Sequence, residues 1–90
     1  MPQYVIERTL PGAGSLSDQE VQGIAKTSNE VLDAMPEVQW QESYVTDDKL
    51  YCVYVAPDAD SVREHARRGG FPADSVEQVR RRIDPTTGGR

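Results

Sequence analysis

The sequence predicts a single α+β domain in which two helices alternate with four strands. Three observations lead to this prediction. Runs rich in β-forming residues lie near the start, in the middle and towards the end of the chain. Apolar residues recur at helical spacing after Ser17, and a short polar turn separates two aromatic-rich runs in the middle of the chain. A length of 90 residues is enough for one small domain.

The first half of the chain predicts a strand followed by a helix. Residues 3–9 are rich in β-forming side chains and are expected to form the first strand. A Pro/Gly loop follows, and Ser17 with Glu20 makes a capping box at a helix start. The helix is expected to run to about Met35, before Pro36, because its apolar residues recur at spacings of three, four and seven: Val21, Ile24, Ala25, Val31, Leu32 and Met35.

Residues 38–45 and 50–56 predict a β-hairpin around a turn at residues 46–49. If Thr46 pairs with Lys49, the register predicts three cross-strand pairs: Tyr44 with Tyr51, Ser43 with Cys52 and Trp40 with Val55. One face would then carry Trp40, Glu42, Tyr44, Tyr51, Val53 and Val55. The other would carry Gln41, Ser43, Val45, Leu50, Cys52 and Tyr54. Both faces are half apolar, so the sequence leaves open which of them packs against the helices.

The remaining residues complete the pattern. Asp58 is expected to cap a second, shorter helix that ends at Gly69 and Gly70. Residues 75–83 alternate well enough to predict a fourth strand, and residues 84–90 a tail. The resulting order β-α-β-β-α-β in one domain over residues 1–90 is the ferredoxin-like arrangement, with a four-stranded antiparallel sheet. Many functions occur on this fold, so it assigns none by itself.

Composition excludes several classes of protein. A net charge of -5 disfavours nonspecific nucleic-acid binding, which needs neutralisation of phosphates. No apolar run approaches the length of a membrane span, and the N-terminus lacks the pattern of a signal peptide. A single cysteine cannot form an internal disulfide, so we expect a reducing, cytoplasmic location. With 37% hydrophobic residues the core is small, and a leftover apolar sheet face would be buried most easily in a homodimer.

Two side chains are candidates for soft metal chemistry. The Cys52 thiolate suits nickel, zinc or copper, although a lone cysteine in a strand is more often a small buried hydrophobe. The only histidine, His65, is a potential metal ligand, but from its position beside the buried line of its helix it is expected at the surface or rim. One thiol and one imidazole fall short of a closed zinc site. A mixed nickel or copper site remains possible if two chains pool their donors.

Three oxygen donors complete the candidate set. Glu7 lies within an otherwise apolar strand, and because the first and third strands are expected to be the central pair, we expect Glu7 to approach Cys52. Tyr44 and Tyr51 are weaker candidates, because a phenol binds metal only with a lowered pKa.

Three segments resemble a family of small bacterial nickel-responsive or nickel-binding proteins. They are Y-V-I-E-R-T near the start, S-Y-V-T-D-D-K-L-Y-C-V-Y-V-A-P in the middle and R-E-H-A-R-R-G-G-F-P-A-D after it. The resemblance extends over residues 3–83 and implies a ferredoxin-like fold, a homodimer and a Ni(II) site. The residues that match and can donate to the metal are Cys52, His65, Glu7, Tyr44 and Tyr51.

The leading hypothesis is therefore a small dimeric protein that buffers or senses Ni(II), with no nucleic-acid or membrane partner. The sequence shows neither a glycine-rich phosphate loop nor a recognisable catalytic triad, so binding is favoured over catalysis. One alternative is a small-molecule-binding protein or a cofactor-independent, monooxygenase-like enzyme whose pocket is lined by Trp40, Tyr44, Tyr54 and His65. Another is a protein interaction module.

Overall fold

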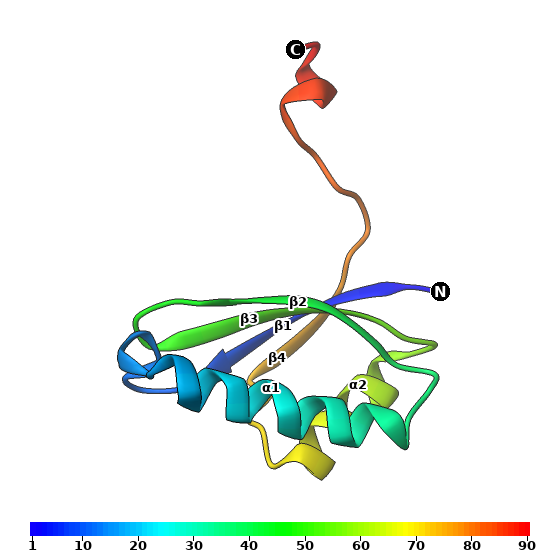
Figure 1. Ribbon diagram of the computed structural model, residues 1–90. Helices are drawn as coiled ribbons and strands as arrows, with labels where there is room; N and C mark the ends of the chain where they lie inside the picture. Colours follow the sequence, from blue (N-terminus) through cyan, green and yellow to red (C-terminus); the bar gives the residue numbers. More distant parts are fainter.

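Four strands form one antiparallel sheet, and two helices cover one of its faces (Figure 1). The computed structural model describes residues 1–90. In chain order the elements are β1 (Gln3–Thr9), a short 3-10 turn (Ala13–Ser15), α1 (Asp18–Asp33), β2 (Gln39–Val45), β3 (Lys49–Val55), α2 (Ala59–Gly69), β4 (Ser75–Gln78) and a second 3-10 turn (Pro85–Gly88). The order of the strands in the sheet is β2-β3-β1-β4. This topology confirms the predicted ferredoxin-like fold.

Both helices begin at the expected caps. The Ser17 hydroxyl accepts a hydrogen bond from the Glu20 amide, and the Glu20 carboxylate accepts one from the Ser17 amide, which completes the capping box of α1. The Asp58 carboxylate accepts from the Ser61 amide at the start of α2. At the end of α2, Gly70 has a φ of 72°, in the left-handed region that favours glycine.

The core lies between the helices and alternate residues of the two central strands. On β1 and β3 every second side chain is buried, with Ile6 opposite Cys52. The ten residues of this core cluster are Tyr4, Ile6, Ala13, Met35, Val38, Leu50, Cys52, Tyr54, Ala56 and Val62. The other side of the sheet has no helix over it (Figure 1). We call it the bare face; it carries Val5, Glu7, Glu42, Tyr44, Tyr51, Val53, Val55 and Glu77.

A β-bulge corrects one pair of the predicted hairpin. Tyr44 pairs with Tyr51 and Ser43 with Cys52, as expected, but Trp40 pairs with Tyr54 and not with Val55. The register shifts between Trp40 and Glu42, because Gln41 is an extra residue on β2. This extra residue turns Trp40 over to the helix-covered side, where it packs against the core.

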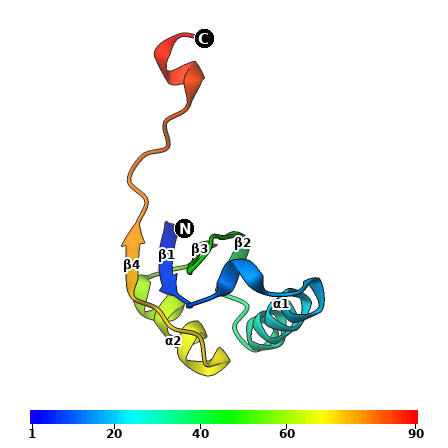
Figure 2. The same cartoon turned by 90° about the vertical axis from the view of Figure 1, so that its left-hand side faces the viewer.

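The fourth strand is shorter than predicted. β4 ends at Gln78, and the amide of Val79 makes the last hydrogen bond to β1, to the Gln3 carbonyl at 2.8 Å. Gln3 is the first residue of β1, so residues 80–83 have no neighbouring strand to pair with. The chain then leaves the sheet on the side away from the helices (Figure 2). Neither helix combines the length and the apolar surface that crossing a bilayer requires.

Candidate functional site

The five predicted metal donors lie on opposite sides of the sheet. Cys52 is buried on the helix-covered side, and His65 is buried on α2 beneath it. Glu7 lies one residue after Ile6, the partner of Cys52, so its side chain points to the bare face. The prediction that Glu7 approaches Cys52 is therefore wrong. Two adjacent positions of a strand face opposite ways, so the pairing of neighbouring strands alone does not bring Glu7 and Cys52 together.

Glu7, Tyr51 and Tyr44 form one row across three strands of the bare face. Glu7 is directly opposite Tyr51, and Tyr51 is directly opposite Tyr44. Side chains in directly opposed positions are close enough to contact one another. The three predicted oxygen donors are thus neighbours, although none of them neighbours the predicted thiol or imidazole.

Ion pairs and hydrogen bonds already occupy this row. The Lys49 ammonium forms a salt bridge with the Glu7 carboxylate, which raises the pKa of Lys49. The Tyr44 hydroxyl donates to the Glu42 carboxylate at 2.6 Å, and this bond raises the pKa of Tyr44. Tyr44 is therefore a neutral phenol at neutral pH, and the carboxylates are the stronger donors of the bare face.

A single chain does not assemble a metal centre from these residues. No group of three or more histidine, cysteine, aspartate or glutamate side chains lies close enough together to hold an ion. Metal binding by Cys52, His65, Glu7, Tyr44 and Tyr51 stays a prediction, and any centre with three such ligands needs donors from outside the chain.

His65 lies deep in the interior and not at the rim. Its side chain is fully buried, and Nε2 lies 3.1 Å from the Ser28 hydroxyl on α1. The Tyr54 ring packs against it with ring centroids 5.2 Å apart. Burial lowers the pKa of His65, and the nearby positive charge of Arg8 lowers it further, so the ring is neutral at neutral pH. Nδ1 has no hydrogen-bond partner.

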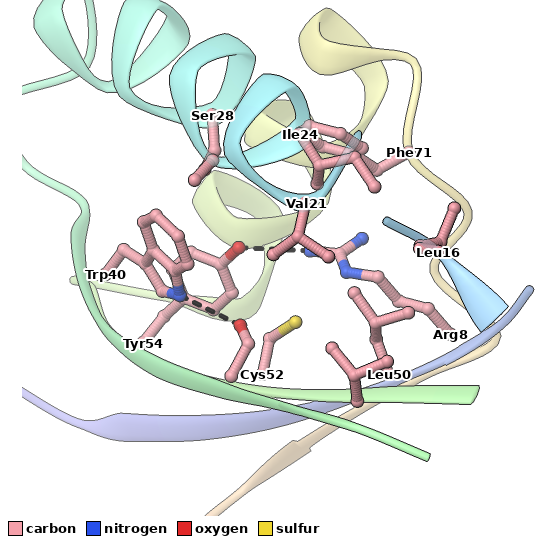
Figure 3. A pocket seen from close by; sticks show the side chains of 13 residues that line it. Arg8, Leu16, Val21, Ile24, Ser28, Trp40, Leu50, Cys52, Tyr54 and Phe71 are labelled. Carbon is pink, nitrogen blue, oxygen red and sulfur yellow. Dashed lines mark hydrogen bonds between the residues drawn. The ribbon is translucent and has the colours of Figure 1, made fainter. Parts of the chain in front are cut away.

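A cavity of about 150 Å³ lies between α1 and the sheet (Figure 3). Its walls are mostly apolar and include the two residues Trp40 and Tyr54 that the sequence predicted for a small-molecule pocket. Of the other two, Tyr44 is on the bare face and His65 lies behind Ser28, which lines the cavity. Cys52 also lines it. The indole nitrogen of Trp40 donates to the Ser43 hydroxyl at 2.9 Å, which holds the indole at the cavity wall.

Arg8 contributes a positive charge to this cavity. Its side chain is 3% exposed and lines the cavity. The guanidinium donates to the Pro72 carbonyl and, at 3.2 Å, to the Tyr54 hydroxyl, and it lies 5.6 Å from the centre of the Phe71 ring. None of the five salt bridges of the chain includes it. Its charge is therefore buried without a carboxylate partner.

Arg8 was not among the predicted site residues, although the sequence contains a signal for it. Tyr4, Ile6 and Arg8 occupy every second position of β1, so an arginine follows two core residues on the same side of a central strand. Arginine is almost never fully buried unless it is paired. An arginine at such a position marks a polar site inside the domain.

Comparison with known proteins identifies the family. Residues 4–79 match the family described as nickel responsive protein SCO4226-like. The chain belongs to this family. Among solved structures, this SCO4226-like protein is similar to SCO4226 from Streptomyces coelicolor A3(2), with a TM-score of 0.77 over 90% of this chain and 99% of that one. At 15% sequence identity this likeness shows the shared fold. A comparison with curated proteins finds no match.

Proposed function

We propose that this protein is a cytoplasmic homodimer that binds Ni(II) and serves to buffer or sense it. Membership of a nickel-responsive family over residues 4–79 supports the metal. The observation that carries the proposal is the row of Glu7, Tyr51 and Tyr44 on the face of the sheet that no helix covers. Three of the five predicted donors are neighbours there.

The charges on the two faces of the sheet favour the bare face as the binding site of a cation. Three carboxylates, those of Glu7, Glu42 and Glu77, lie there with Lys49 as the opposing charge. On the other side, the unpaired guanidinium of Arg8 is close enough to lower the pKa of His65 by repulsion. A divalent cation between Cys52 and His65 would meet the same repulsion. We therefore place the metal on the bare face.

A second copy of the chain would complete such a site. Val5, Val53 and Val55 are only partly exposed and form an apolar strip between the carboxylates of the bare face. Packing two such faces together buries the strip and, through two-fold symmetry, brings each donor row near its equivalent. Residues 79–90 rise on the same side of the sheet, where they can contact the second copy (Figure 2).

Calorimetric titration with Ni(II), Zn(II) and Mg(II) tests the proposal, with the mass in solution measured in parallel. Selectivity among these ions depends on geometry and availability, so all three are compared. We expect a fixed number of Ni(II) ions per dimer and an affinity at least about tenfold weaker in E7Q, because a charged donor is replaced by a neutral amide. E30Q, on the exposed side of α1, is the matched control and should bind as the parent does.

The buried pair provides the competing outcome. If C52S lost nickel binding while E7Q kept it, the site would lie on the helix-covered side and the proposed location would be wrong. If the parent gave no heat with nickel, the proposed binding itself would be wrong. A second candidate function, binding of a small molecule, is favoured by the cavity beside Arg8.

A further inference from the structure

We propose that the cavity between α1 and the sheet is a binding site for a small carboxylate with a single aromatic ring, or an aliphatic body of similar size, held at its charged end by Arg8 and Tyr54. The site lies on the opposite side of the sheet from the proposed nickel site and does not depend on it.

The buried charge of Arg8 is the first argument. A guanidinium taken out of water without a carboxylate partner is costly, and such charges inside proteins are normally paired. Only two of its N–H donors have acceptors in the chain, the Pro72 carbonyl and the Tyr54 hydroxyl, out of the five that an arginine carries. The remaining donors are available to an anion in the cavity.

The Asp74 carboxylate, which the charge of Arg8 does influence, does not supply that anion. The Asp74 carboxylate accepts a hydrogen bond from the Thr9 amide at 2.5 Å, and hydrogen bonds from Thr9 are the main reason that its pKa is lowered. Arg8 is the smallest of the causes of this lowering and forms no salt bridge with Asp74. Asp74 is exposed and does not line the cavity, so Arg8 is the only charged side chain in the cavity wall.

The Tyr54 hydroxyl is the second donor. It accepts a hydrogen bond from Arg8, and the Ser28 hydroxyl is its other side-chain neighbour for hydrogen bonding. A hydroxyl proton rotates to suit its partners, so it can turn to an acceptor in the cavity. Burial raises the pKa of Tyr54, which keeps the phenol protonated. Figure 3 shows the hydroxyl and the guanidinium joined by a hydrogen bond among the residues that line the cavity. A carboxylate placed there would accept from both groups, as carboxylates do from arginine and a neutral hydroxyl.

The remaining walls specify the body of the ligand. Ten of the thirteen lining residues are hydrophobic, among them Leu16, Ile24, Leu50 and Phe71. A cavity of about 150 Å³ with walls of this kind accommodates a benzene ring. The rim offers a way in, because Val21 is 39% exposed and Val45 is 45% exposed. The ligand class is therefore one apolar ring or branched chain with one negative charge.

The only tryptophan of the chain lines the cavity, so its fluorescence reports occupancy directly. We would titrate the full chain with four probes: benzoate, benzyl alcohol, benzylamine and acetate. Benzoate should bind at least about tenfold more tightly than benzyl alcohol, because a charge-assisted hydrogen bond is worth more than a neutral one. Benzylamine should be rejected by Arg8, and acetate should bind weakly because it leaves the apolar walls unfilled.

Two variants separate charge from shape. R8M keeps an apolar side chain of similar length and should lose the preference for benzoate over benzyl alcohol. The matched control is R81M, at an exposed position beyond β4, which should behave as the parent does. A25F should fill the cavity from α1 and abolish binding of both ring-containing probes. Circular dichroism establishes that each variant is folded.

The outcomes decide the proposal without reference to nickel. Equal affinity for benzoate and benzyl alcohol in the parent, or unchanged benzoate binding in R8M, would overturn the role of Arg8. No tryptophan response to any ring-containing probe would overturn the site. Since the probe panel uses the parent protein, it remains decisive even if R8M does not fold. The variant E7Q should bind benzoate normally, which separates this site from the proposed nickel site.

Discussion

At the scale of single residues, the interior of this protein contains polar groups that a purely structural core would not need. His65 is fully buried, with Ser28 at Nε2 and no partner at Nδ1. A buried polar atom without a partner costs free energy that a hydrophobic side chain of the same shape would avoid. The neighbouring Arg8 makes a protonated imidazole still less favourable here.

The lowered pKa of His65 predicts an acid-sensitive fold. In the unfolded chain a histidine titrates near pH 6.5. The folded state resists protonation, so unfolding takes up a proton between that pH and the lower folded pKa. The contribution of His65 to stability is therefore complete above about pH 6.5 and falls as the pH drops, by up to about 1.4 kcal/mol per pH unit.

Thermal or urea unfolding between pH 7.5 and 5 measures this loss. His65 is the only histidine, so the variant H65Q should show a much flatter profile in the same range. Glu64, whose pKa is lowered to about 2 chiefly by its hydrogen bonds from Arg67 and Arg68, affects stability only at more acidic pH. An identical slope for the parent and H65Q would contradict the prediction.

At the scale of elements, local sequence signals predicted where almost every helix and strand begins. The capping groups Ser17 and Asp58 and the hairpin turn at residues 46–49 act through neighbouring residues, so they are visible in the sequence. The end of β4 was missed because it depends on where β1 begins, far away in the chain. The bulge at Gln41 was missed because both registers give a plausible alternation, and packing of the indole selects between them.

Deletion of Gln41 should be tolerated, because it removes the bulge without moving the indole. Without Gln41, Glu42 follows Trp40 directly, and β2 pairs with β3 in continuous register with Trp40 still opposite Tyr54 on the helix-covered side. The deletion removes the exposed hydrogen bond between the Gln3 and Gln41 side chains, so we expect a loss of stability of no more than about 1.5 kcal/mol. The fluorescence emission of Trp40 should stay as in the parent. A deletion at residue 88, in the C-terminal 3-10 turn, is the control, and a shift of the emission to longer wavelength in the Gln41 deletion would contradict the assigned register.

The sequence predicted which residues could belong to the candidate site, but not which of them lie together. Residue type alone identified Cys52, His65, Tyr44 and Tyr51. Their distribution over the two faces of the sheet depends on how side chains alternate along each strand. Arg8 was missed because a charged residue in a strand is ordinarily taken as exposed. The pairing of buried arginine with an apolar cavity exists only once α1 is packed over the sheet.

At the scale of the whole molecule, the chain is less compact than its length allows. Its radius of gyration is 13.9 Å, whereas about 12 Å is typical of a compact domain of this length. The difference reflects the C-terminal segment, which extends away from the sheet on the bare side (Figure 1). Ile83 in this segment is 75% exposed. A second copy of the chain packed on the bare face would cover part of this segment.

The variant V53D tests this arrangement. Val53 lies in the apolar strip of the bare face, and a carboxylate there would be buried without a partner if two copies pack together. We expect the dissociation constant of the dimer to rise at least about tenfold, measured by light scattering after size exclusion. Q22D, exposed on α1, is the control and should leave the mass unchanged. A parent protein that stays monomeric at high concentration would contradict the homodimer.

The position of β4 also has a consequence for the rate of folding. β1 pairs with both β3 and β4, and β4 comes later in the chain than β3. Pairing of Tyr4 with Gln78 therefore closes a longer loop than pairing of Tyr4 with Tyr54. Because loop closure costs entropy before the contacts form, we expect β4 to join the sheet after β1 and β3 have paired. The last step of folding is then a long-range pairing of the slow kind.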